Sequence, residues 1–109
     1  MATSLFEIVE HPIDVEAVRK KVVDRNAGAI TLFVGTVREM TNGKKTLFLE
    51  YQAYPEMAVK MFEQIAKEIK ERWPEAKIAI THRVGRLEIT EIAVVIAVSS
   101  PHRKAAYEA

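Results

Sequence analysis

The protein has 109 residues, of which 49% are hydrophobic and 28% charged, values typical of one compact globular domain. Sixteen Lys and Arg residues against fifteen Asp and Glu give a formal net charge of +1, which argues against bulk attraction to nucleic acid or to an anionic membrane. The absence of cysteine excludes disulfides and thiolate sites and fits a reducing compartment, so we expect a cytoplasmic protein. The N-terminus is acidic where a signal peptide is basic, and the longest apolar run, 92–98, is too short to span a membrane.

The N-terminal part of the chain predicts a short strand followed by a helix. Residues 5–9 favour a strand, and Asp14 is suited to cap a helix at its N-terminus. Apolar residues then recur at helical spacing until Asn26 and Gly28, where we expect the helix to end. These apolar residues are Val15, Val18 and Val22.

A β-hairpin is expected next. The run 29–38 is rich in β-branched and aromatic residues, as strands are. Asn42 and Gly43 tolerate the positive φ angles of a type I′ turn, so we expect residues 46–54 to return antiparallel to 29–38. One face of this return strand is expected to carry Leu47, Leu49, Tyr51 and Ala53.

The second half of the chain predicts a long amphipathic helix and two strands. Pro55 suits the first turn of the helix. Residues 77–84 alternate between apolar and polar side chains and predict a half-buried strand, whereas the almost wholly apolar run 91–99 predicts a central strand covered on both faces. The apolar face of the helix is expected to consist of Ala58, Phe62, Ile65, Ile69 and Trp73.

The segment after the last strand suggests an anion-binding site. Ser100 can cap a helix whose first turn holds Pro101, His102 and Arg103. A helix N-terminus offers unpaired N–H groups and a partial positive charge, so cations placed there favour the binding of a phosphate or carboxylate. The alternative is that both side chains extend into solvent. Arg38 ends a predicted strand and could point toward the same helix, or it could be a solvated surface residue.

The other titratable residues have simpler explanations than catalysis. His82 shares a face with two isoleucines, which favours a half-buried, hydrogen-bonded histidine over a metal ligand. Glu88 and Glu91 are expected to be a solvated pair. Solvated positions are also expected for the basic run on the first helix, Arg19, Lys20 and Lys21, and no second ligand accompanies His11.

The chain as a whole resembles the large subunit of molybdopterin synthase. The segments that carry the resemblance are, in order, FVGTVRE, LEYQAYPEMA, ERWP, ITHRVGRLEI and AVSSPHRKAAYEA, and they extend over nearly the whole sequence. The resemblance implies an α/β hammerhead fold, which is an α+β domain with a mostly antiparallel sheet and two to three helices. It also implies that residues 1–109 form one domain without the C-terminal segment of the family.

The resemblance further implies an enzyme of molybdenum cofactor biosynthesis. In this family a small ubiquitin-like sulfur-carrier subunit donates sulfur from its C-terminal thiocarboxylate to cyclic pyranopterin monophosphate, which becomes molybdopterin. The implied assembly is a central homodimer with one carrier subunit at each outer end, a heterotetramer. No metal and no cofactor is implied. The implied precursor-binding residues are Thr36, Val37, Arg38, His102 and Arg103.

The catalytic residues are not assigned by the resemblance. The essential lysines of the family lie beyond the position of Ala109, and Lys104 does not match them. One alternative is therefore a dimeric scaffold that binds the sulfur carrier without turnover. A nucleic-acid-binding domain is a weaker alternative because the net charge is near zero and the aromatic residues fall mostly on expected core faces. The basic residues it would use are Arg83, Arg86, Arg103 and Lys104.

One position departs from the family pattern. Thr90 stands where the family commonly has glycine. Glycine adopts positive φ without strain, so the substitution concerns the geometry of the local turn and none of the implied binding residues.

Overall fold

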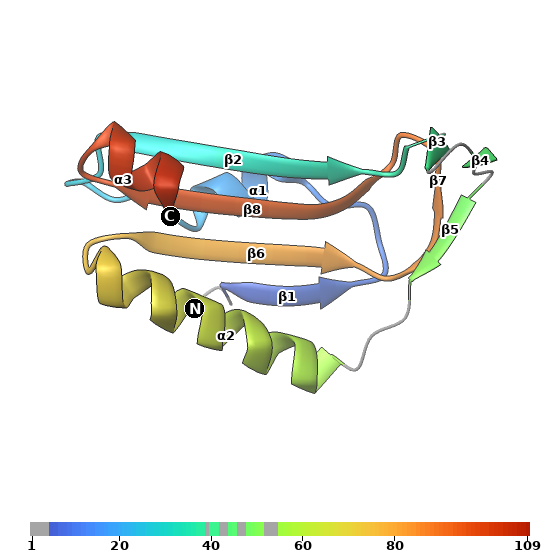
Figure 1. Ribbon diagram of the computed structural model, residues 1–109, viewed down its shortest axis with the longest axis horizontal. Helices are drawn as coiled ribbons and strands as arrows, with labels where there is room; N and C mark the ends of the chain where they lie inside the picture. The colour runs from blue at the N-terminus through green and yellow to red at the C-terminus, as the bar shows by residue number, and fades with distance from the viewer. Residues whose placement is uncertain (1–4, 39, 42–43, 46–47, 52–54) are drawn as a thin grey trace.

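A computed structural model describes residues 5–38, 40–41, 44–45, 48–51 and 55–109 (Figure 1). Its main feature is a four-stranded sheet in the order β1-β6-β8-β2. The strands are β1 (Phe6–Val9), β6 (Lys77–Arg83), β8 (Ile92–Ser100) and β2 (Ala29–Thr36). β1 runs parallel to β6, whereas β6–β8 and β2–β8 are antiparallel, so the predicted mostly antiparallel sheet is confirmed.

Helices cover both faces of this sheet (Figure 1). α1 (Val15–Lys20) packs on one face, and α2 (Pro55–Arg72) and α3 (Arg103–Glu108) lie on the other. Successive residues of β8 supply the two separate cores, since Ala97 packs toward α1 and Val98 toward α2. A strand buried on both faces is what the apolar run 91–99 predicted.

Two small two-stranded sheets lie beyond one end of the main sheet (Figure 1). β3 (Met40–Thr41) pairs with β4 (Lys44–Lys45), and β5 (Phe48–Tyr51) pairs with β7 (Gly85–Glu88). The antiparallel pairing of β3 with β4 confirms the predicted chain reversal. The prediction that residues 46–54 return along 29–38 is wrong for the described residues 48–51, because they pair with β7, whereas β2 pairs with β8. A turn signal specifies only a local reversal, whereas the apolar β8 offers β2 a neighbour that buries more surface. The Asn42–Gly43 turn and residues 46–47 and 52–54 lie outside the described residues.

The first helix begins as predicted and ends earlier. The Asp14 carboxylate accepts hydrogen bonds from the backbone N–H groups of Glu16 (3.0 Å) and Ala17 (3.3 Å), which confirms it as the N-cap. The helix stops at Lys20, not at Asn26. The next residues include the β-branched Val22 and Val23, which lose side-chain freedom in a helix.

Two burial predictions for the second half of the chain need correction. α2 begins at Pro55 as expected, but Ile65 is 42% exposed and Ala66 takes the core position. β6 is buried on both faces and not on one, because α1 covers the side that carries Ala79 and Thr81. The buried stripe of α2 follows the spacing of Phe62, Ala66, Ile69 and Trp73.

Thr90 lies in the turn between β7 and β8 with a φ angle of 75°. This left-handed conformation is strained for a β-branched residue. The turn keeps it because the Thr90 N–H donates to the Val37 carbonyl (2.8 Å) and the Val37 N–H donates to the Glu91 carbonyl (3.0 Å). Thr90 therefore occupies a position whose positive φ angle glycine would adopt without strain.

We expect Thr90→Gly to raise the free energy of unfolding by about 1 kcal/mol, because it removes the side chain that opposes positive φ. Urea denaturation measures the change. Thr90→Ala is the matched control, since it keeps a Cβ atom and should recover less. Equal stabilities of the glycine and alanine variants would contradict the strain at this turn.

Candidate functional site

The first group of predicted binding residues, Thr36 to Arg38, lies where β2 ends. Val37 is 2% exposed and packs with Leu87 and Ala93. Its backbone is bonded on both sides to the β7–β8 turn. Thr36 and Arg38 flank this anchor and are exposed. The buried Val37 thus fixes the backbone that carries the Arg38 guanidinium at the surface.

A charged brace holds the same turn. One carboxylate oxygen of Glu91 accepts from an Arg83 guanidinium N–H at 2.7 Å, and the other accepts from the backbone N–H of Glu88 at 2.8 Å. The Glu88 N–H and, second, Arg83 lower the pKa of Glu91 below its ordinary value. Glu88 is solvent-exposed, as expected, and forms an ion pair with Arg86 at 2.9 Å. Glu91 is half-buried instead of fully solvated, because it bonds to Arg83 and to the Glu88 backbone. Sequence reasoning missed this brace, although the position of Arg83 at one strand end and Glu91 at the start of the next was a usable signal.

The second group, His102 and Arg103, lies where β8 passes into α3. The predicted cap is wrong: Ser100 is buried within β8 opposite Ala29, and His102 occupies the N-cap position without a side-chain cap bond. Pairing in the sheet keeps Ser100 extended, so the helix starts later, at Arg103, and has six residues. His102 and Arg103 are both exposed. Any affinity for an anion at this end therefore rests on these two side chains, because so short a helix supplies little dipole.

The C-terminal helix is fixed to the sheet beside these residues. The Thr31 hydroxyl donates to the Ala106 carbonyl at 2.8 Å, and Ala106 is 1% exposed. A Cβ atom on Gly28 would lie 2.9 Å from the Pro101 carbonyl oxygen, so only glycine permits this close approach of the two segments. The backbone at His102 and Arg103 is thus held by β2 as well as by β8.

The two groups lie at opposite ends of the sheet. Ala29 is opposite Ser100, whereas Thr36 is opposite Ile92. Seven residue steps at about 3.4 Å each separate the ends by about 24 Å. The expectation that Arg38 points toward the C-terminal helix is therefore wrong, because the antiparallel pairing places that helix at the far end of β2 (Figure 1).

Other candidate positions add no metal or membrane feature within the described residues. Among the described residues, no group of three or more His, Asp or Glu side chains could hold a metal ion. His82 is half-buried, as predicted, and His11 is exposed. None of the described helices has the length and apolar character needed to cross a membrane.

Comparison with known proteins identifies the family. A sequence model described as "MoaE protein" matches residues 8–109. This chain belongs to the MoaE protein family. The molybdopterin synthase catalytic subunit of Halalkalibacterium halodurans is 61% identical over 109 residues, which are 100% of this chain and 70% of that protein. The predicted family is therefore confirmed. The name of the Halalkalibacterium halodurans relative agrees with the function that the resemblance predicted.

Solved structures of MoaE proteins show the same fold. The molybdopterin synthase structure from Staphylococcus aureus is 51% identical, with a TM-score of 0.93 over 97% of this chain and 77% of that chain. A Helicobacter pylori structure, described as a complex of subunits 1 and 2 of molybdopterin-converting factor, is 22% identical, with a TM-score of 0.78 over 96% of this chain and 71% of that chain. The predicted α+β class is confirmed. The roles of the five implied binding residues stay predictions.

The hydrogen bonds of Glu91 to Arg83 and to the Glu88 N–H predict that the stability of the fold depends on pH. Because the folded-state pKa of Glu91 is lowered, its contribution is present above the ordinary glutamate pKa and is lost as the pH falls through the lowered value. We expect Glu91→Gln to lose less stability than the parent protein between neutral and acidic pH, as measured by urea unfolding at both. Glu108→Gln, on exposed α3 at the other end of the sheet, serves as the control. Identical pH profiles for the parent and Glu91→Gln would contradict the role of this carboxylate.

Proposed function

We propose that this chain acts in the cytoplasm as a molybdopterin synthase catalytic subunit and binds the pterin precursor. Sulfur would come from the thiocarboxylate of a small ubiquitin-like carrier protein, and the acceptor would be cyclic pyranopterin monophosphate. The observation that carries the proposal is the MoaE match over residues 8–109, together with a close relative named as the catalytic subunit. The Helicobacter pylori complex of two subunits supports a partner subunit for this fold.

Arg38, His102 and Arg103 are the groups suited to hold the anionic precursor. A guanidinium donates two parallel hydrogen bonds to a phosphate, and such charge-assisted bonds are about twice as strong as neutral ones. Thr36 and Val37 would position the ligand by fixing the backbone beside it, since the Val37 side chain is buried and its N–H and carbonyl groups are bonded to the β7–β8 turn. The side chains of Arg38, His102 and Arg103 are all exposed. They can therefore contact a ligand without unfolding of either end of the sheet.

The geometry requires two chains if one precursor contacts both groups. A separation of about 24 Å is far larger than a small pterin phosphate can bridge. In a two-fold homodimer, each chain contributes the same surface, so the Arg38 end of one chain can meet the His102–Arg103 end of the other. Two equivalent sites then result.

The outer strand β2 offers a surface for such a dimer. It is the last strand of the described sheet and joins the two groups of binding residues. Its sequence from Ala29 to Val37 contains no charge, although exposed edge strands commonly carry charges that prevent pairing. Phe33, which was expected in the core, is 59% exposed, and its neighbours Leu32 and Val34 are 42% and 40% exposed. Apolar side chains on an unpaired edge favour burial against a second copy.

The shared site predicts that two variants with weakened precursor binding complement each other. We expect Arg38→Ala and Arg103→Ala each to weaken binding of cyclic pyranopterin monophosphate by about 1 to 3 kcal/mol, measured by calorimetry. When the two variants are unfolded and refolded together, half of the dimers should be mixed. Each mixed dimer has one site with both arginines, so about one quarter of the parent's tight sites should return.

Lys104→Ala is the matched control, because it removes an exposed cation of the same helix that the family pattern does not assign. Unchanged affinity in both arginine variants would contradict the binding role and favour the scaffold alternative. Weak binding by each variant without recovery on mixing would place each site within one chain.

A further inference from the structure

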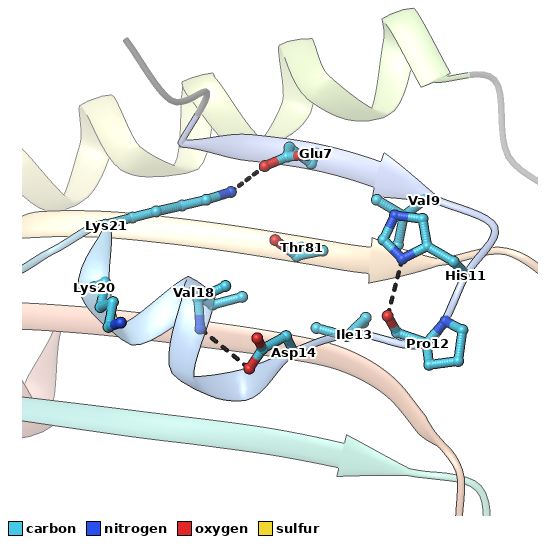
Figure 2. Close-up of a pocket in the computed structure, with 11 residues that line it drawn as sticks. Glu7, Val9, His11, Pro12, Ile13, Asp14, Val18, Lys20, Lys21 and Thr81 are labelled. Atoms are coloured by element: carbon cyan, nitrogen blue, oxygen red, sulfur yellow. Dashed lines mark hydrogen bonds and ion pairs between the residues drawn. The ribbon is translucent and has the colours of Figure 1, made fainter. Parts of the chain in front are cut away.

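A cavity of about 570 Å³ lies on the α1 face of the sheet, beside β1 (Figure 2). It is at the opposite edge of the sheet from β2 and is therefore separate from the residues proposed to hold the precursor. Its volume falls in the range of small-molecule sites. Much of its wall is apolar and consists of Val9, Ile13, Ala17 and Val18.

A buried hydroxyl on the cavity wall lacks a hydrogen-bond partner. Thr81 in β6 is 5% exposed, and its Oγ1 atom bonds to no group of the described residues. Figure 2 shows Thr81 between the Lys21–Glu7 pair and the α1 side chains. An unsatisfied buried hydroxyl destabilises the folded chain, so a ligand that bonds to it regains free energy.

A desolvated ammonium group lies at the same place. The Lys21 side chain is 7% exposed and extends from the end of α1 to form an ion pair with Glu7 of β1 (Figure 2). The expectation that Arg19, Lys20 and Lys21 are a solvated basic run is thus wrong for Lys21. An ammonium group has three donors, and Glu7 is the one partner that the described residues show for it. Further donors can therefore serve a ligand.

The charges around the cavity limit the kind of ligand. Lys20 and Lys21 contribute two positive charges, and Glu7 and Asp14 contribute two negative ones. The His11 ring also lines the cavity, and its Nδ1 atom lies 2.9 Å from the Pro12 carbonyl oxygen. Asp14 is engaged by the backbone N–H groups at the start of α1, so its charge is partly compensated by the helix. One additional negative charge is accommodated, whereas a second would face Glu7 without a matching cation.

We propose that this cavity binds a small monocarboxylate with a branched aliphatic body. The carboxylate accepts hydrogen bonds from the Lys21 ammonium and the Thr81 hydroxyl, and the aliphatic part packs against Val9, Ile13 and Val18. Charge-assisted bonds to the Lys21 and Thr81 side chains supply the orientation, and burial of the aliphatic part supplies most of the affinity.

The test titrates 3-methylbutanoate into the whole isotope-labelled chain and follows backbone amide shifts by NMR. We expect saturable shifts centred on Thr81, Val18 and Lys21. Thr81→Val keeps the shape of the side chain and should raise Kd about fivefold through loss of one hydrogen bond to the carboxylate. Lys21→Met should raise Kd by more than about tenfold. The neutral 3-methylbutanamide should bind more weakly than the acid.

Ser99→Ala is the matched control. Ser99 is also a buried residue of the sheet whose hydroxyl has no partner among the described residues, and it does not line the cavity. It should leave Kd unchanged. Absence of saturable shifts at these positions would overturn the proposal, as would a Kd that is the same for the parent, Thr81→Val and Lys21→Met. Equal binding of inorganic phosphate would also overturn it, because attraction to surface cations would then suffice.

Discussion

The antiparallel pairing of β2 with β8 is the constraint on which the rest of the structure depends. It runs from Ala29 opposite Ser100 to Thr36 opposite Ile92 and joins the outer strand to the most buried one. Backbone hydrogen bonds and apolar burial act together along this pairing, so its register cannot shift without moving core side chains to the surface. The same register separates the two predicted groups of binding residues, and it therefore decides how a complete site can be assembled.

Both ends of this pairing are stiffened by local contacts. At one end Val37 is buried and bonded to the β7–β8 turn, which the Arg83–Glu91 ion pair and the strained Thr90 complete. At the other end the Thr31 hydroxyl holds α3 through the Ala106 carbonyl. The exposed residues proposed to bind the precursor are thus held on fixed backbone, which would lower the entropy lost when a ligand binds. The strain at Thr90 is tolerated because its neighbours bond the turn on both sides.

The sequence predicted local features well and pairings less well. Helical periodicity located α2, Asp14 marked the start of α1, and the apolar run 91–99 indicated the central strand. The turn signal at Asn42–Gly43 could not reveal that β2 pairs with β8, because strand partners are chosen by burial over long sequence separations. The family resemblance supplied the candidate residues, but only the register showed that Arg38 and Arg103 are far apart in one chain. Likewise, a run of three basic residues gave no sign that Lys21 alone turns inward to Glu7.

The central claim is that the Arg38 end of one chain meets the Arg103 end of another. Because the chain contains no cysteine, Arg38→Cys and Arg103→Cys each provide a unique attachment point for a spin label. The most direct measurement mixes chains labelled only at position 38 with chains labelled only at position 103 and determines the distance between labels by electron paramagnetic resonance. A site shared between two chains requires an interchain distance clearly shorter than the about 24 Å that separates the two ends within one chain. The absence of any such short interchain distance in the mixed sample would contradict it.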